Sequence, residues 1–211
     1  DTGRYYPRKK DQKLQNQLGL RDKFVVGYIG THGLAHDLDT VLNGAKLLDK
    51  LHDDSRFCIM MLGDGAAKRA LMRRARDERI QNIVFLDTVP KEQVARYWAV
   101  LDAAIIHLKN DPVFKTVIPS KLFECMGMGI PVLLGVKGES ADIVDREGVG
   151  IVFEPENPEN FVSSLRRLAD NPDFLARVKC NGPVAARRFD RSVLAMQMLS
   201  LLQNVADEKA A

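Results

Sequence analysis

The sequence predicts an α/β fold, a Rossmann-like doubly wound parallel sheet of about six strands with additional helices at its C-terminal end. Two observations predict it. Short, continuously apolar runs alternate with amphipathic helical segments from residue 24 onward, and from Pro158 the pattern is only helical. Unbroken apolar runs are typical of strands that are buried on both faces. Strands that alternate with helices form parallel sheets with right-handed crossovers.

Each element of this fold has a local signal. The apolar runs predict strands at 24–29, 57–62, 83–86, 103–106, 132–134 and 151–153. The amphipathic segments between them predict helices at 38–51, 66–79, 91–100, 121–128 and 139–146. Asn157-Pro158 and Asn171-Pro172 each indicate a helix start, with Asn as the cap and Pro at the first helical position. A last helix is expected from Ser192 to about Val205.

The chain divides into three segments by pattern. Residues 1–23 are polar and are expected to contain a short helix at 10–18 that Gly19 ends. Residues 24–190 are expected to form the ligand-binding Rossmann-like domain, and residues 191–211 a C-terminal helix and tail. We expect the apolar face of that last helix to be incompletely covered, which invites dimerisation or partial disorder. This face consists of Leu194, Met198, Leu201 and Leu202.

Composition narrows the class of protein. The 211 residues suit one large α/β domain or two small ones, and 31 basic against 28 acidic residues give a net charge of +3. This balance does not indicate a nucleic-acid partner, whereas a mild basic excess fits a phosphate-bearing ligand or an anionic membrane surface. Three widely spaced cysteines show no metal-ligand spacing and no even disulfide set, so a reducing cytoplasm is expected. The polar start predicts no signal peptide, and no apolar run approaches the ~20 residues of a membrane span.

Ligands of doubly wound sheets bind outside the carboxyl ends of the strands, which selects four loops. In the first loop, Gly30 and Gly33 allow close backbone approach and offer N–H groups to phosphate. His32 and His36 in the same loop are candidates for phosphate contact or stabilisation of transition-state charge. The loop lacks the spacing of the dinucleotide fingerprint, and an ordinary glycine turn is an equally good interpretation.

The second and third loops carry weaker signals. Gly63-Asp64-Gly65 predicts a sharp turn into a helix, in which Asp64 is either a ligand group or a helix cap. The loop at 87–90, which holds Val89, favours a simple turn, with contact to a base as the alternative. The basic run that follows the second loop, from Lys68 to Arg76, predicts a solvated helix face, with a membrane-facing patch as the minority alternative.

The fourth loop leads into the most informative stretch, at 116–131. Pro119-Ser120 predicts a helix start in which the Ser hydroxyl caps free backbone N–H groups. The helix dipole and those N–H groups favour an anion, and Lys121 adds a positive charge. Glu124, one turn later, can accept hydrogen bonds from a diol. Anion donors, a cation and a carboxylate within five residues suit a sugar nucleotide. His107, which precedes this loop, is expected to be structural.

Five motifs follow one another along the chain: Gly30 through Ala35, Asp39-Thr40, Gly63-Asp64-Gly65, Phe114 through Glu124, and Gly138-Glu139. Together they resemble the C-terminal, donor-binding domain of retaining GT-B glycosyltransferases of family 4. The branch that the chain is most similar to is the bacterial O-antigen type that includes N-acetyl-L-fucosamine transferases. The resemblance covers almost the whole chain and implies one half of a GT-B fold.

The resemblance implies roles for particular residues. Glu124 matches the second glutamate of a Glu-x7-Glu motif, which binds the ribose, whereas Thr116 stands where the first glutamate is expected. Lys115 or Thr116 is expected to replace that contact to the sugar. Thr31 and His36 stand where the family has a diphosphate-binding Arg and Lys, so Lys121 and a protonated or hydrogen-bonding histidine are expected to supply the charge.

The resemblance also implies a nucleotide-sugar donor, with a UDP-linked N-acetylamino sugar favoured, and a lipopolysaccharide or lipid-linked glycan acceptor. No metal and no other cofactor are expected. The start of the chain resembles an interdomain linker. The acceptor domain and its catalytic histidine are therefore expected in an N-terminal half outside this sequence, so that no catalytic residue is assigned here and the fragment is expected to be inactive alone.

The expected location is the cytoplasm, with association of the full enzyme with the inner face of the bacterial cell membrane as an open alternative. A sugar-nucleotide epimerase half-domain and a non-catalytic nucleotide-binding module remain alternative functions. The expected donor-binding residues are Gly30, Thr31, His32, Gly33, His36, Gly63, Asp64, Gly65, Val89, Lys115, Thr116, Pro119, Ser120, Lys121 and Glu124.

Overall fold

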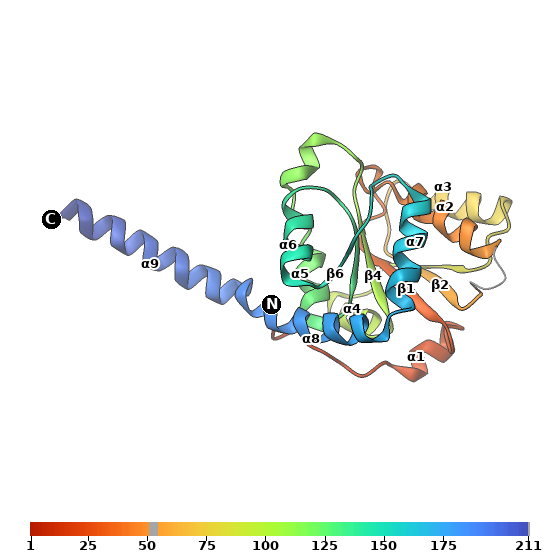
Figure 1. Ribbon diagram of the computed structural model, residues 1–211, viewed down its shortest axis with the longest axis horizontal. Coiled ribbons are helices and arrows are strands. Elements are labelled where there is room, and N and C mark those ends of the chain that lie inside the picture. The colour runs from red at the N-terminus through yellow and green to blue at the C-terminus, as the bar shows by residue number, and fades with distance from the viewer. Residues whose placement is uncertain (51–54, 211) are drawn as a thin grey trace.

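A single six-stranded sheet forms the centre of the computed structural model, which describes residues 1–50 and 55–210 (Figure 1). All strand pairs are parallel, and the strand order is β3-β2-β1-β4-β5-β6. This architecture confirms the predicted doubly wound sheet. The strands are β1 (Phe24–Ile29), β2 (Phe57–Leu62), β3 (Ile83–Leu86), β4 (Ala103–His107), β5 (Val132–Gly135) and β6 (Gly150–Val152).

Helices connect the strands and complete the chain. They are α1 (Gln12–Gln17), the 3-10 helix η1 (Leu34–His36), α2 (Leu38–Asp49), α3 (Lys68–Asp77), α4 (Lys91–Trp98), the 3-10 helix η3 (Pro112–Thr116), α5 (Ser120–Met128), α6 (Glu139–Glu147), α7 (Pro158–Ala169), α8 (Pro172–Arg188) and α9 (Arg191–Ala210). Most bounds lie within two residues of the prediction. The predicted end of the second helix, at residue 51, lies outside the described residues.

Two apolar cores lie on opposite faces of the sheet. One core contains side chains of α2, α3 and α7, among them Val41, Leu71 and Phe161. The other contains side chains of α4, α5, α6 and α8, among them Trp98 and Leu122. Every residue of β2 and β4 is buried, as expected for strands covered on both faces.

Two helices, α7 and α8, begin at asparagine caps that the sequence predicts correctly. The Asn157 side chain accepts a hydrogen bond from the Asn160 N–H at 2.8 Å, and Asn171 does the same for Phe174 at 2.9 Å. In both helices Pro occupies the first turn. One prediction is wrong: Ser120 does not cap α5, because Pro119 occupies the cap position and no side chain bonds to the first turn.

The last helix lies apart from the sheet. Figure 1 shows α9 extending away from the domain, and Leu194, Met198, Leu201 and Leu202 are all exposed along it. Among the helices of residues 1–50 and 55–210, none combines the length and apolar character needed to cross a bilayer.

The strand order locates a crevice. β1 and β4 are neighbours at the centre of the sheet, but α2 follows β1 on one face and α5 lies on the other. Chains that leave adjacent strands toward opposite faces open a crevice at the carboxyl edge, where doubly wound folds bind ligands. The loops after β1 and β4 hold most of the predicted site residues.

Candidate functional site

A cavity of about 250 Å³ lies at the carboxyl ends of β1, β2 and β3. Five of its lining residues belong to the predicted site, namely Gly30, Thr31, Gly63, Asp64 and Val89. Sequence reasoning missed the other four, Ile29, Leu62, Thr88 and Val94. Three separate loops therefore meet around one hollow, as expected for a ligand site at this edge of a parallel sheet.

The loops after β1 and β2 are in direct backbone contact. A Cβ atom added to Gly63, whose φ is +142°, would lie 1.9 Å from the Gly30 carbonyl oxygen, so only glycine fits. The Gly30 N–H donates to the Leu62 carbonyl at 2.9 Å, and the His32 N–H donates to Asp64 at 2.8 Å. These two N–H groups are therefore committed to the fold and are not available to a phosphate group.

The buried Lys68 side chain fastens the second loop to the third. Its Nζ donates to the carbonyl oxygens of Gly63 at 2.8 Å and Leu86 at 3.0 Å, and to Asp87 Oδ1 at 2.6 Å. This ammonium lowers the pKa of Asp87. The prediction of a solvated basic face is wrong for Lys68, because its stem turns inward and only 7% of the side chain is exposed.

The Lys121 ammonium packs against the start of the first loop. Its Nζ lies 4.1 Å from the centre of the Tyr28 ring, a cation–π contact, and 2.9 Å from where a Cβ atom of Gly30 would lie. The Tyr28 hydroxyl donates to the Thr31 carbonyl at 2.7 Å, which holds the ring in place. Burial lowers the pKa of Lys121 to about 8. Within the described part of the chain, no carboxylate forms an ion pair with Lys121.

The uncapped first turn of α5 lies next to this ammonium. Because no side chain caps the helix, its first N–H groups have no side-chain partner, and the helix dipole places partial positive charge there. An unpaired, largely desolvated ammonium beside a helix N-terminus is electrostatically unfavourable until an anion arrives. The arrangement is therefore suited to a phosphate or diphosphate group.

The histidines of the first loop are neutral at physiological pH. His32 is fully buried, and neither ring nitrogen has a hydrogen-bond partner. Burial, and then the nearby Lys68 charge, lower the pKa of His32 to about 4, and burial also lowers the pKa of His36. These lowered pKa values disfavour a protonated histidine in the unliganded protein, so that a hydrogen-bonding histidine and the Lys121 ammonium are left for this task.

His107 is structural, as predicted. Its Nδ1 lies 2.9 Å from the His36 carbonyl oxygen, and its Nε2 accepts from the Glu156 N–H at 3.1 Å. This pair of contacts defines the neutral tautomer with the proton on Nδ1. Burial lowers the pKa of His107, in agreement with that assignment.

The predicted ribose ligand Glu124 does not line the cavity at β1–β3, although its charge acts on the nearby Lys121 ammonium and opposes the effect of burial on the pKa of that group. Its Oε2 accepts a hydrogen bond from Trp98 Nε1 at 3.1 Å. Glu124 lines a second cavity of about 290 Å³ together with Tyr5, Ile118, Ser120 and other residues of the N-terminal segment and α9. Trp98 and Tyr5 were not among the predicted site residues.

The remaining predicted residues do not line the cavity at β1–β3. Lys115 and Thr116 belong to the exposed η3, and the Lys115 carbonyl packs against Gly138, where a Cβ atom would lie 2.1 Å away. Pro119 and Ser120 form the start of α5. Gly33 begins η1 and Gly65 contacts the His32 carbonyl, so both shape the loops. The structure does not bring Lys115 or Thr116 into the cavity lining.

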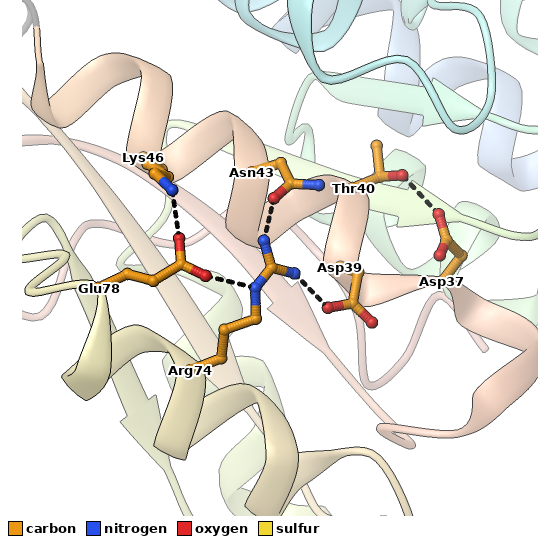
Figure 2. A network of polar contacts seen from close by, with 7 residues as sticks. All are labelled: Asp37, Asp39, Thr40, Asn43, Lys46, Arg74 and Glu78. Carbon is orange, nitrogen blue, oxygen red and sulfur yellow. Dashed lines mark hydrogen bonds and ion pairs between the residues drawn. The ribbon is translucent and has the colours of Figure 1, made fainter.

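A polar network joins α2 to α3 beside the first loop (Figure 2). Arg74 donates to Asp39 at 2.5 Å, to Glu78 at 2.6 Å and to Asn43, while Lys46 donates to Glu78 at 2.6 Å. The Asp39-Thr40 motif therefore holds the two helices together, because Asp39 binds Arg74. Among the described residues, no three His, Cys, Asp or Glu side chains are grouped where they could hold a metal ion.

Comparison with known proteins identifies the family of this chain. Residues 23–171 match the family model of glycosyl transferases group 1. The chain belongs to this family. A 96-residue stretch is 27% identical to a Bacillus subtilis (strain 168) protein with the name "Putative teichuronic acid biosynthesis glycosyltransferase TuaH". That stretch is 45% of this chain and 24% of the relative, so the chain matches about a quarter of it.

Solved structures of glycosyltransferases share the fold. HepE of Anabaena, crystallised with UDP, superposes with a TM-score of 0.81 at 17% identity, over 97% of this chain and 55% of HepE. The C-terminal domain of LpcC, a glycosyl transferase group 1 family protein from Francisella tularensis, gives 0.72 at 16% identity over 89% and 96% of the two chains. Sucrose-phosphate synthase from Thermosynechococcus elongatus gives 0.79 at 16%, over 99% and 51%. The chain thus has the α/β fold seen in GT-B glycosyltransferases, and it spans about half the length of HepE.

Proposed function

We propose that this chain is the nucleotide-sugar-binding domain of a retaining GT-B glycosyltransferase of family 4. The diphosphate binds at the start of α5 beside Lys121, and the base occupies the crevice formed by the loops after β1, β2 and β3. Glu124 binds the ribose diol. Binding needs no metal, because the helix terminus and one ammonium neutralise the leaving diphosphate.

The observation that carries this proposal is the unpaired Lys121 ammonium over the Tyr28 ring. It lies beside the uncapped α5 terminus and against Gly30, at the edge of a cavity that three sheet loops surround. The cation–π contact with Tyr28 offsets only part of the cost of burying an ammonium that has no ion-pair partner. A bound anion would compensate the charge of this ammonium. Because His32 and His36 are neutral and Lys68 is paired with Asp87, Lys121 is the cation that we assign to the anion.

The donor is proposed to be a UDP-linked N-acetylamino sugar, and the acceptor a lipopolysaccharide or lipid-linked glycan, as in the O-antigen branch. The complex of HepE with UDP and the TuaH name support a nucleotide-sugar donor and a cell-envelope role. The acceptor site and the catalytic histidine are proposed to belong to a further domain of the full-length protein, which would act in the cytoplasm.

Calorimetric titration with UDP, GDP and ADP, with and without Mg²⁺, tests the proposal. We expect UDP to bind with the same affinity whether Mg²⁺ or a chelator is present. Binding of all three nucleotides with equal affinity would argue against a UDP donor, and binding that required Mg²⁺ would contradict the neutralisation by Lys121. Product analysis with the full-length protein then separates sugar transfer from epimerisation of the donor and from binding alone.

We also propose that the full enzyme associates with the anionic inner face of the membrane through α3. Arg69, Met72, Arg73 and Arg76 are exposed at helical spacing and together line a shallow surface hollow. Arg74, on the same helix, is neutralised by the network of Figure 2. Among the described residues, no carboxylate is ion-paired with Arg69, Arg73 or Arg76. Guanidinium groups bind phosphates bidentately, and each adds about 1 kcal/mol of attraction at an anionic surface.

A further inference from the structure

The loops after β2 and β3 separate where the sheet ends. The register of the two strands ends at the pair Leu62–Leu86, and the Gly63 N–H makes a last backbone bond to the Leu86 carbonyl at 3.2 Å. Beyond this point each loop contributes to the lining of the cavity at β1–β3, one with Asp64 and the other with Val89. The size of that cavity therefore depends on contacts that join the loops outside the strand ladder.

The side chain of Lys68 makes such contacts. Its Nζ donates to the Gly63 carbonyl at 2.8 Å in one loop, and to the Leu86 carbonyl at 3.0 Å and Asp87 Oδ1 at 2.6 Å on the side of the other. An ammonium has three donor protons, and these three acceptors use all of them. Lys68 therefore has no proton left for a ligand, which separates its role from the one proposed for Lys121.

The position of Lys68 is unfavourable for a cation that lacks these partners. Only 5% of the residue is exposed, and it is the first residue of α3, where the helix dipole is positive. Burial of an ammonium is costly unless hydrogen bonds and an opposite charge compensate it. The hydrogen bond from Lys68 lowers the pKa of Asp87, so that this partner stays ionised at neutral pH.

We propose that Lys68 is a positioning residue of the base subsite, and that it makes this subsite selective for a pyrimidine over a purine by fixing the separation of the two loops. This inference rests on the proposed binding of a uridine nucleotide in the crevice. A purine has two fused rings and a pyrimidine one, so a cavity of fixed size discriminates between them more strongly than one that can widen. Lys68 does not touch the ligand and acts only through the loops.

A charge-neutral double variant tests the proposal. Lys68→Met/Asp87→Asn removes the ion pair and all three donor protons of Lys68 without changing the net charge. The matched control is Lys137→Met/Glu154→Gln, which removes a pair whose atoms lie 2.5 Å apart. That pair joins the loops after β5 and β6, away from the proposed base subsite.

The Gly63 amide provides a measurement that needs no ligand, because its hydrogen bond to Leu86 joins the same two loops. We expect hydrogen exchange of this amide to become roughly tenfold faster in Lys68→Met/Asp87→Asn, since the loops separate more often. The control variant should exchange at the rate of the unmodified chain. An unchanged rate in Lys68→Met/Asp87→Asn would overturn the inference, whatever the ligand results.

Calorimetric titration with UDP, ADP and pyrophosphate tests the selectivity. In Lys68→Met/Asp87→Asn we expect UDP to bind roughly three- to tenfold more weakly. ADP should lose less affinity, because a wider subsite admits a purine more easily, so the ratio of the ADP to the UDP dissociation constant should fall. Pyrophosphate has no base and should bind with unchanged affinity. The control variant should keep all three affinities.

Asp87→Ala tests the same inference without a change in the interior, since 98% of the Asp87 side chain is exposed. It removes one of the three acceptors, so the ratio of dissociation constants should fall by a smaller factor, roughly twofold. Thermal unfolding establishes whether each variant keeps its fold. If the double variant does not fold, Asp87→Ala decides the question, and an unchanged ratio would overturn the inference.

Equal losses of affinity for UDP, ADP and pyrophosphate would give Lys68 a general electrostatic role and would also overturn the inference. Failure of the unmodified chain to bind any of the three ligands would instead overturn the proposed function. The exchange rate of the Gly63 amide separates these two failures, because it reports the junction of the loops in the free protein.

Discussion

At the scale of single residues, the candidate site contains side chains whose pKa values are changed by burial. Lys121, with a pKa of about 8 in the free protein, must be protonated to bind a diphosphate, and the bound anion raises its pKa. At a pH between the pKa of Lys121 in the free protein and its pKa in the complex, Lys121 takes up a proton when UDP binds. The affinity for UDP therefore falls as the pH rises through this range. From pH 7.5 to 9 we expect UDP affinity to fall roughly five- to tenfold, since phosphate itself is already ionised there.

Lys121→Met should weaken binding at pH 7.5 roughly 10- to 100-fold and remove this pH dependence. The exposed Lys109, on the loop that leads from β4 toward α5, provides the control as Lys109→Met, which should keep both properties. Calorimetry at the two pH values checks the prediction. An unchanged pH profile in Lys121→Met would show that another group titrates.

The buried His32 predicts a second pH effect, on stability. Its pKa is about 4 in the folded chain and about 6.5 when unfolded, so the unfolded state binds more protons between these values. The unfolding free energy should therefore fall as the pH drops from 6.5 toward 4, by up to ~3 kcal/mol for His32 alone. His36 and His107, whose pKa values are also lowered, act in the same direction.

Urea unfolding at pH 7 and pH 4.5 measures this effect, with His32→Phe as the variant. The phenyl ring has no titrating group, so the difference in unfolding free energy between the two pH values should shrink. Equal differences in the two proteins would mean that His32 is accessible to protons in the folded state.

At the scale of elements, sequence signals were reliable where the chemistry is local. The Asn157 and Asn171 caps act within three residues, so the sequence predicts them correctly. Lys68 was misassigned because its partners at Leu86 and Asp87 are distant in sequence and meet it only through the sheet. Ser120 was misassigned as a cap because the helix begins one residue earlier than predicted, so that Pro119 is the cap residue and Ser120 is the first residue of the helix.

The arginine face of α3 carries a prediction at this scale. Sedimentation with vesicles that contain phosphatidylglycerol should carry the chain down, whereas phosphatidylcholine vesicles should not. Replacing Arg69, Arg73 and Arg76 by Gln should reduce the bound fraction strongly and lessen its dependence on salt. The charge-matched control replaces the exposed Lys9, Lys13 and Lys50 by Gln, and equal losses in both triple variants would reduce the effect to net charge.

At the scale of the whole molecule, the alternation of strands and helices was sufficient to predict the sheet, its parallel direction and the edge that holds the site. Five predicted residues meet in one cavity because parallel strands present their loops at one edge. The sequence did not indicate the hydrogen bond from Trp98 to Glu124, because the two residues are 26 positions apart and meet only when α4 packs beside α5.

The central claim is that UDP binds at the carboxyl edge, with its diphosphate at the start of α5. Mapping amide chemical shifts during titration of the ¹⁵N-labelled chain with UDP tests it most directly. We predict that the largest shifts occur at Thr31, Asp64, Val89, Ser120 and Lys121, while the amides of α9 stay unchanged. Shifts confined to the arginine face of α3, or the absence of any saturable shift, would contradict the account.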